Sequence, residues 1–268
     1  MLGQGIGNRC VILVMGVHRS GTSALTGALA RTGARLPRDL LMPQPDNRDG
    51  FFESERIVSL HDEVLAAAQS TWDDAGGWTE AQRDIIRESR FRHRLWTLLR
   101  QDLPGPGPLL IKDPRLCRLL PLWDDLAAER GLDLRHVLAI RHPAEVAASL
   151  AVRNGMPPPA ALRLWLRSYL DAERHTRGRF RIATSYDVLL REKSRFVLPL
   201  ARSLGLARAA SPRTMALEVD ALLRDDRRHH HAASRDDRPG TVMALYEWLL
   251  NGLQPEAFPA AALGEAAC

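Results

Sequence analysis

A loop near the N-terminus carries residue types that bind anions. The apolar run 10–15 has the composition of a buried parallel strand, and it leads into a loop that contains Gly16 and Gly21, followed by a predicted helix. This order directs the first N–H groups and the dipole of the helix at an anion. The glycine spacing fits a nucleoside-triphosphate P-loop, but Thr22 occupies the lysine position and Arg19 is the loop's only arginine or lysine. The loop therefore predicts an anion site that differs from that of a kinase or ATPase.

A second group suited to an anion follows the predicted strand 134–140. Arg141 comes directly after the strand, Pro143 and Glu145 are typical of a helix start, and Ser149 lies two turns further on. An arginine fork and a hydroxyl can clamp a dianionic phosphate, although an arginine at a strand end also serves as a helix cap or ion-pair partner. Two such strand ends in one sheet favour a ligand with two separate anionic groups.

Alternating strands and helices must position these loops. Strands are predicted at 10–15, 108–111, 134–140 and 180–184. Helices are predicted at 23–33, 54–70, 79–101, 116–130, 143–153, 158–177, 193–205 and 239–252. We therefore expect an α/β, P-loop NTPase-like three-layer fold, with a mostly parallel central sheet of about four to five strands flanked by helices. Ligands bind beyond the C-terminal strand ends of such sheets.

The composition favours one globular domain over residues 1–268. The chain is 45% hydrophobic, yet no uncharged stretch is long enough to cross a bilayer, and no secretory signal is recognisable at the N-terminus. The three cysteines are far apart, so we expect no metal site, no disulfide framework and a reducing, cytoplasmic location. The net charge of +5 is almost all arginine and is spread along the chain, which fits a genomic base-composition bias or attraction of an anionic substrate. We expect no nucleic-acid partner.

Three segments depart from the regular alternation. Residues 34–53 form a long loop rich in Pro, Asn, Asp and Gly, and with the following helices they make 34–101 the expected acceptor-binding region. Residues 225–239 are an expected flexible, charged linker, in which His229–His231 form a solvated loop or a ligand-contacting lid rather than a metal site. The C-terminal helix and tail, 240–268, are expected to close the core or to contribute to a homodimer, and the oligomeric state stays open.

Five blocks in the same order resemble the sulfotransferase superfamily, and especially its bacterial branch. They are Arg19-Ser-Gly-Thr-Ser23, Asp49-Gly-Phe-Phe-Glu53, Lys112-Asp-Pro-Arg115, Arg141 to Leu150, and Ser185-Tyr-Asp187. The resemblance covers about residues 10–205, with a weaker echo at 222–229. It implies transfer of a sulfuryl group from 3′-phosphoadenosine-5′-phosphosulfate (PAPS), without a metal, to a hydroxyl in preference to an amine. The implied acceptor is a carbohydrate, a glycoconjugate or a small natural product.

The resemblance also implies which residues bind PAPS. Arg141 and Ser149 would hold the 3′-phosphate, and Tyr186 would contact the adenine. The loop residues would hold the 5′-phosphosulfate; they are His18, Arg19, Ser20, Gly21, Thr22 and Ser23.

Three residues are the expected catalytic groups: Glu53, Arg19 and Lys112. An acceptor hydroxyl needs a base, and Glu53 follows two aromatic residues that would bury it and raise its pKa. Arg19 and Lys112 would stabilise negative charge, although Lys112 is also suited to a surface pair with Asp113. Other candidate bases stay open, namely Glu55, His61, Asp62 and His18.

Two other functions fit the phosphate-binding loop. A P-loop kinase or NTPase with an atypical loop would need Lys112 to replace the missing lysine and would need a Mg²⁺ site that no motif supplies. A non-catalytic nucleotide-binding protein would keep the nucleotide-binding fold and lack catalysis.

Overall fold

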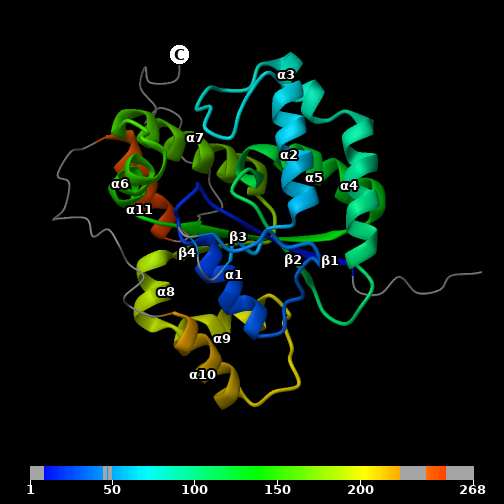
Figure 1. Cartoon of the computed structure of the whole chain (residues 1–268), viewed down its shortest axis with the longest axis vertical. Helices are drawn as coiled ribbons and strands as arrows, with labels where there is room; N and C mark the ends of the chain where they lie inside the picture. Colours follow the sequence, from blue (N-terminus) through cyan, green and yellow to red (C-terminus); the bar gives the residue numbers. More distant parts are fainter. Residues whose placement is uncertain (1–8, 45–46, 48–49, 224–239, 252–268) are drawn as a thin grey trace, which may run out of the picture.

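Four parallel strands form the centre of the molecule (Figure 1). The computed structural model describes residues 9–44, 47, 50–223 and 240–251. Within this part of the chain the sheet has the order β2-β1-β3-β4. The strands are β1 (Cys10–Met15), β2 (Leu109–Lys112), β3 (Asp133–Ile140) and β4 (Arg181–Ser185). The expected α/β class with a parallel central sheet is confirmed.

Helices cover both faces of the sheet and make three layers (Figure 1). One face carries α2 (Glu55–Ala67), α3 (Glu80–Ile86), α4 (Ser89–Asp102), α5 (Leu116–Arg130), α6 (Pro143–Asn154), α7 (Pro158–Thr176) and α11 (Thr241–Leu250). The other carries α1 (Thr22–Arg31), α8 (Tyr186–Glu192), α9 (Ser194–Ser203) and α10 (Pro212–Leu222). Successive side chains of β1 alternate between the two cores, Leu13 facing one and Ile12 the other, because strand side chains point to opposite faces in turn. All six residues of β1 are buried, which explains its unbroken apolar sequence.

The strand register brings three loops to one edge of the sheet. Val14 of β1 is opposite Lys112 of β2, and Ile140 of β3 is opposite Ser185 of β4. Because β1 lies between β2 and β3, the loop that follows Met15 lies between the loops that follow those two strands. The candidate residues therefore meet at the C-terminal edge of the sheet.

The predicted helix 79–101 is wrong as a single element. It forms two helices, α3 and α4, because Glu88 has an extended backbone with ψ 139°. The interruption allows Ile86 and Phe91, from either side of it, both to enter the same core. The predicted linker 225–239 with His229–His231, and the tail beyond residue 251, lie outside the described residues.

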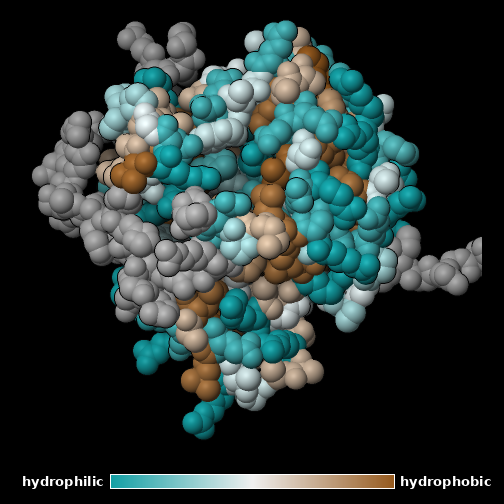
Figure 2. Space-filling model, in the orientation of Figure 1, coloured by the Kyte–Doolittle hydropathy of each residue, from teal (hydrophilic) through white to brown (hydrophobic). Residues whose placement is uncertain are grey.

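The visible face of the molecule is mostly hydrophilic (Figure 2). Its hydrophobic residues form narrow strips and small groups rather than one broad patch. In the part of the chain that the structure describes, no helix has both the length and the apolar character that crossing a membrane requires.

Candidate functional site

The loop between β1 and α1 is shaped by two close approaches. A Cβ atom added to Gly16 would lie 2.4 Å from the carbonyl oxygen of Ala139, so only glycine lets the loop pass β3. Gly21, at the N-cap of α1, has φ 87°, and a Cβ there would lie 2.2 Å from the ring of Tyr186. Arg19 also adopts a positive φ of 72°, an uncommon conformation for a residue with a side chain. The loop is therefore held in a strained form at the start of a helix, as anion-binding loops are.

Gly21→Ala should destabilise the protein by about 2–4 kcal/mol, because it adds a steric clash to the cost of a positive φ. Gly178→Ala is the matched control, since Gly178 has φ 72° but no atom within 4 Å of an added Cβ. We expect about 1 kcal/mol for the control. Denaturant unfolding of both variants measures the difference, and equal losses would show that Tyr186 yields to the added methyl group.

One side of the loop contacts the residues that follow β3. Arg19 Nε donates to Ser149 Oγ at 2.8 Å, and Arg141 Nη1 donates to the carbonyl oxygen of Arg19 at 3.1 Å. The Arg141 guanidinium lies over the Tyr186 ring, 4.8 Å from its centre, and its Nε donates to Glu145 at 2.8 Å. We call Arg19, Arg141, Ser149 and Tyr186 the arginine–tyrosine cluster. Residues far apart in the sequence thus form one basic, aromatic site.

The positions of these four residues follow from local structure. Pro143 begins α6 and the His142 side chain caps it, so that Ser149, on the buried side of that helix, faces the loop. Trp165 of α7 donates from Nε1 to the carbonyl oxygen of Arg141 at 3.1 Å and fixes its backbone. Tyr186 is the first residue of α8 and is buried against Gly21.

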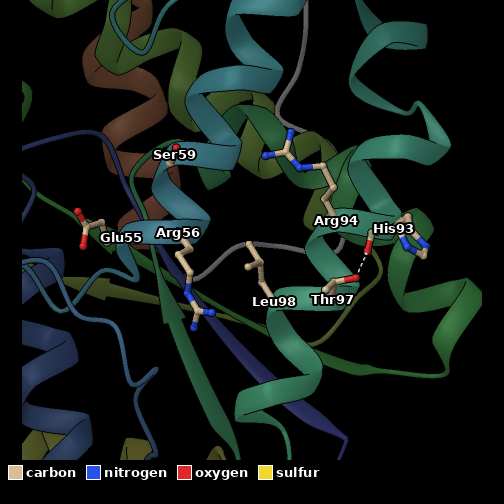
Figure 3. A pocket seen from close by; sticks show the side chains of 7 residues that line it. All are labelled: Glu55, Arg56, Ser59, His93, Arg94, Thr97 and Leu98. Atoms are coloured by element: carbon tan, nitrogen blue, oxygen red, sulfur yellow. Dashed lines mark hydrogen bonds between the residues drawn. The ribbon is translucent and has the colours of Figure 1, made fainter.

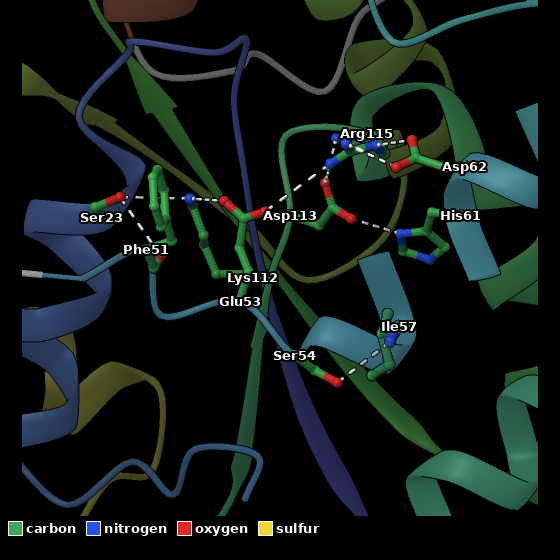
Figure 4. A network of polar contacts seen from close by, with 10 residues as sticks. All are labelled: Ser23, Phe51, Glu53, Ser54, Ile57, His61, Asp62, Lys112, Asp113 and Arg115. Atoms are coloured by element: carbon green, nitrogen blue, oxygen red, sulfur yellow. Dashed lines mark hydrogen bonds and ion pairs between the residues drawn. The ribbon is translucent and has the colours of Figure 1, made fainter. Parts of the chain in front are cut away.

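The other side of the loop holds a buried ion pair (Figure 4). Lys112 Nζ donates to Glu53 Oε1, and both side chains are less than a tenth exposed. Lys112 Nζ also lies 3.4 Å from Ser23 Oγ, on the first turn of α1. The alternative of a surface pair between Lys112 and Asp113 is wrong, because Lys112 is buried and its Nζ contacts Glu53. We call Glu53, Lys112 and Ser23 the carboxylate–lysine cluster.

Glu53 is placed by a strained turn. The preceding residue, Phe52, has φ 58°, which is exceptional for a bulky side chain, and its ring lies against Gly27 of α1. The next residue, Ser54, caps α2 by accepting the N–H of Ile57 at 3.2 Å. Burial raises the pKa of Glu53 above its ordinary value, and the charge of Lys112 opposes that effect. A buried carboxylate of this kind has the properties of a general base.

Among the alternative bases, His61 is already hydrogen-bonded at both ring nitrogens. Trp123 Nε1, which can only donate, bonds to His61 Nε2 at 3.0 Å, so Nε2 accepts and Nδ1 carries the proton. That Nδ1–H donates to Asp113 at 2.7 Å. His61 is therefore a buried, neutral structural link, without a nitrogen turned to a ligand.

The other three alternative bases lie in three different environments. Asp62 binds Arg115 through both carboxylate oxygens, at 2.6 and 3.1 Å. Glu55 is exposed and lines a groove between α2 and α4. His18 is at the loop, edge-on to Trp72 with ring centres 4.5 Å apart, and burial, then the charge of Arg115, lowers its pKa well below the ordinary value. His18 Nε2 is buried without a hydrogen-bond partner, so this neutral imidazole has a nitrogen that is suited to bind a ligand.

A groove of about 650 Å³ lies between α2 and α4 (Figure 3). Its lining combines apolar surface with charged groups of both signs, and it is formed by Glu55, Arg56, Ser59, His93, Arg94, Thr97 and Leu98. The groove belongs to the region 34–101 that is expected to bind the acceptor, but none of the residues of the two clusters lines it.

Sequence comparison identifies no relatives: no protein-family model and no curated protein matches the chain. A solved structure does match. The sulfotransferase domain of the Synechococcus PCC 7002 olefin synthase superimposes with a TM-score of 0.50 at 16% identity, covering 92% of this chain and 97% of that one. The chain has a sulfotransferase-domain fold. At this identity the likeness concerns the fold, and it confirms the fold that the five sequence blocks imply.

Two further structures with the sulfotransferase name superimpose more weakly. Sulfotransferase STF1 from Mycobacterium tuberculosis gives a TM-score of 0.47 at 16% identity, over 79% of this chain and 72% of that chain. The sulfotransferase domain from the curacin biosynthetic pathway gives 0.46 at 15% identity, over 82% and 80%.

One residue of the site, Arg115, was not among the candidate site residues predicted from the sequence. Arg115 lies between the carboxylate–lysine cluster and the His61–Asp113 pair, with Nη1 3.9 Å from Glu53 Oε2 and 3.1 Å from Asp113 Oδ1. The available signal was its place at the end of the block Lys112-Asp-Pro-Arg115. Among the described residues, no group of three or more His, Cys, Asp or Glu side chains is placed to hold a metal ion.

Proposed function

We propose that the protein is a sulfotransferase that moves a sulfuryl group from PAPS to a hydroxyl of an acceptor, in preference to an amine. The observation that carries this proposal is the arrangement of two clusters on either side of one phosphate-binding loop. The arginine–tyrosine cluster offers cations and an aromatic ring, and the carboxylate–lysine cluster offers a base and a cation. PAPS has anionic groups at both ends of its ribose and a base, so its chemistry matches this arrangement.

The residues of the loop and of the arginine–tyrosine cluster fit PAPS. The N-terminal N–H groups of α1, with Ser20 and Thr22, would hold the 5′-phosphosulfate, as helix N-termini hold phosphates. Arg141 and Ser149 would hold the 3′-phosphate, because an arginine fork and a hydroxyl bind a dianion well. Tyr186 would pack on the adenine. His18, Gly21 and Ser23 complete the loop.

When bound, PAPS supplies a sulfuryl group on a good leaving group, and the products are the sulfated acceptor and 3′-phosphoadenosine 5′-phosphate (PAP). Glu53 takes the proton of the acceptor hydroxyl as the oxygen attacks, and its burial keeps water from competing. Lys112 and Arg19 stabilise negative charge around the transferred group, in the way that positioning and charge drive phosphoryl transfer. Arg19 is a fixed charge and a poor acid, so its contribution is electrostatic.

The acceptor is proposed to be a carbohydrate, a glycoconjugate or a small natural product bound by the region 34–101. The groove between α2 and α4 supplies polar groups of both signs for such a molecule. Fold alone does not choose among these acceptors, since one fold hosts many substrates.

Thermal shift with ligands tests the donor site. PAP should raise the melting temperature without a metal, whereas ATP with Mg²⁺ should not. Stabilisation by ATP–Mg²⁺ alone would favour a P-loop kinase or NTPase instead. Mass spectrometry of PAPS incubated with panels of glycans and phenols then detects an acceptor whose mass rises by one SO₃ group, and binding of PAP with no transfer to any acceptor would indicate a nucleotide-binding protein.

A further inference from the structure

Glu53 lies between two cations that are held very differently. Lys112 is an unbranched side chain held only at its tip, where Nζ contacts Glu53 and lies 3.4 Å from Ser23 Oγ. Arg115 is fixed in place. Its Nε and Nη2 donate to Asp62 at 2.6 and 3.1 Å, and its Nη1 donates to Asp113 at 3.1 Å.

A chain of oriented hydrogen bonds leads to Arg115, and Figure 4 shows its part from His61 through Asp113 to Arg115. It starts at Trp123 of α5, whose N–H bonds to His61 Nε2, and continues from His61 Nδ1–H to Asp113 Oδ2. Asp113 Oδ1 then accepts both the backbone N–H of Arg115, at 2.8 Å, and its Nη1. His61 and Asp113 are fully buried, so no water competes for these bonds. Each donor in this series has an acceptor. The direction of the hydrogen bonds is fixed, because the indole nitrogen of Trp123 can only donate.

The charges of Asp113 and Arg115 stabilise each other. Burial alone would raise the pKa of Asp113, but the charge of Arg115 and the hydrogen bond from His61 outweigh it and hold that pKa well below the ordinary range. Asp113 is thus a permanent anion, and Arg115 beside two carboxylates is a permanent cation. This arrangement is unnecessary for a simple structural pair at Glu53, which Lys112 already satisfies.

We propose that Arg115 is the fixed counter-ion of Glu53, held in place by Asp62 and by the Trp123–His61–Asp113 chain, which leaves Lys112 able to turn from Glu53 to the donor. The proposal rests on the proposed sulfotransferase function and adds a division of labour between the two cations. Arg115 is a positioning residue that keeps the base ionised while Lys112 serves the transferred group. Without Arg115, Glu53 would have no cation beside it once Lys112 turned to the donor, which is the step in which Glu53 acts as the base.

The other groups near Glu53 do not replace Arg115. Asp113 acts on Glu53 in the opposite sense, because its negative charge raises the pKa of Glu53. His18, from the phosphate-binding loop, is neutral, because burial and then the charge of Arg115 lower its pKa well below the ordinary value. From α1, the uncharged Ser23 contacts Lys112 rather than Glu53.

The first experiment is a pH profile at saturating PAPS with the acceptor varied, so that kcat/KM reports groups in the donor-bound enzyme. A base acts when ionised, so activity falls as pH drops through the pKa of Glu53. In Arg115→Gln the acidic limb of the profile should move to higher pH. Relative to wild type, kcat/KM should then fall at least about threefold more at the acidic end of the profile than at the pH-independent maximum. Arg87→Gln is the matched control, because Arg87 forms an equally bidentate pair with Asp125 that lies outside the site.

His61 tests the chain behind Arg115. His61→Leu should move the limb in the same direction, because Asp113 loses its donor. His61→Asn should restore much of the profile, since an asparagine N–H can take the place of the Nδ1–H. An acidic limb identical to wild type in both Arg115→Gln and His61→Leu, with only the melting temperature lowered, would overturn the proposal and leave a structural role.

A readout without activity separates this proposal from the proposed function. A double-mutant cycle of Glu53→Gln and Arg115→Gln measures their coupling by denaturant unfolding at several pH values. The coupling should be stabilising near neutral pH and should disappear in acid, where Glu53 is protonated. Absence of coupling at neutral pH would reject Arg115 as the counter-ion even if sulfate transfer is observed, and coupling without any transfer would keep it while the proposed function fails.

Discussion

Glu53→Gln should lower kcat by about 10²–10⁴-fold while PAP binds with near wild-type affinity. The amide keeps the size of the side chain and still accepts a hydrogen bond from Lys112, but it cannot take the acceptor's proton. Because Glu53 belongs to the carboxylate–lysine cluster rather than the arginine–tyrosine cluster, its loss should leave the nucleotide contacts intact. Single-turnover kinetics with PAPS, beside calorimetric titration with PAP, measure the two effects separately.

A stability effect accompanies this substitution and needs its own control. Removing one charge of a buried pair leaves the other without compensation, which typically costs about 3–5 kcal/mol. The double variant Glu53→Gln/Lys112→Met removes both charges and should recover part of that loss in stability. If the single variant keeps turnover near wild type, the base is another group, and the neutral, partly orphaned His18 is the first to test by His18→Ala.

Glu53 also predicts the direction of the pH dependence. Its pKa lies above the ordinary glutamate value because of burial, so the acidic limb of kcat/KM in the free enzyme should lie above that of an exposed carboxylate. Activity should rise with pH through this limb. The limb should vanish from the residual activity of Glu53→Gln, and a limb that persists there would assign it to another group.

The sequence is most informative where burial dictates residue type. The strand predicted at 10–15 matches β1 because all six residues are buried between two helical layers. The helix α8 was not predicted, because Tyr186 starts it directly after β4 without a turn signal. The helix α10 was also not predicted, although Ser211 and Pro212 are typical start residues; Val219 is its single buried residue, so the helix contributes little apolar sequence to the core.

The candidate site shows a different limit. Spacing pointed to Arg141, just before α6, and to Ser149 within that helix. The structure brings Arg19 to them from the loop after β1, because β1 and β3 are parallel and end at the same edge of the sheet. Spacing says nothing of the contact between Glu53 and Lys112, since a long-range pair depends on how a loop folds onto the sheet. The strained backbone of Phe52, which turns Glu53 inward, is likewise invisible in a sequence that holds two adjacent aromatic residues.

Arg141→Ala should weaken PAP binding by about 2–3 kcal/mol, or roughly 30- to 150-fold, because a charge-assisted clamp on a dianion is lost. Adenosine 5′-monophosphate, which has no 3′-phosphate, should lose little affinity in the same variant. Calorimetric titration with the two nucleotides therefore assigns the role of Arg141 to the 3′-phosphate. Arg141→Lys should be intermediate for PAP, since it keeps a charge and loses the planar fork.

The contacts of Arg141 determine how this result is interpreted. Arg141 also donates to the carbonyl oxygen of Arg19 and to Glu145, which is 2% exposed, so its loss both loosens the loop and removes the ion pair between Arg141 and a buried carboxylate. Arg141→Ala/Glu145→Gln also removes the charge of that carboxylate and serves as the control. If affinity for both nucleotides falls equally in the single variant and recovers in the double variant, Arg141 maintains the shape of the loop and does not bind the 3′-phosphate. A loss confined to PAP, and unchanged in the double variant, assigns the second anion site to this arginine.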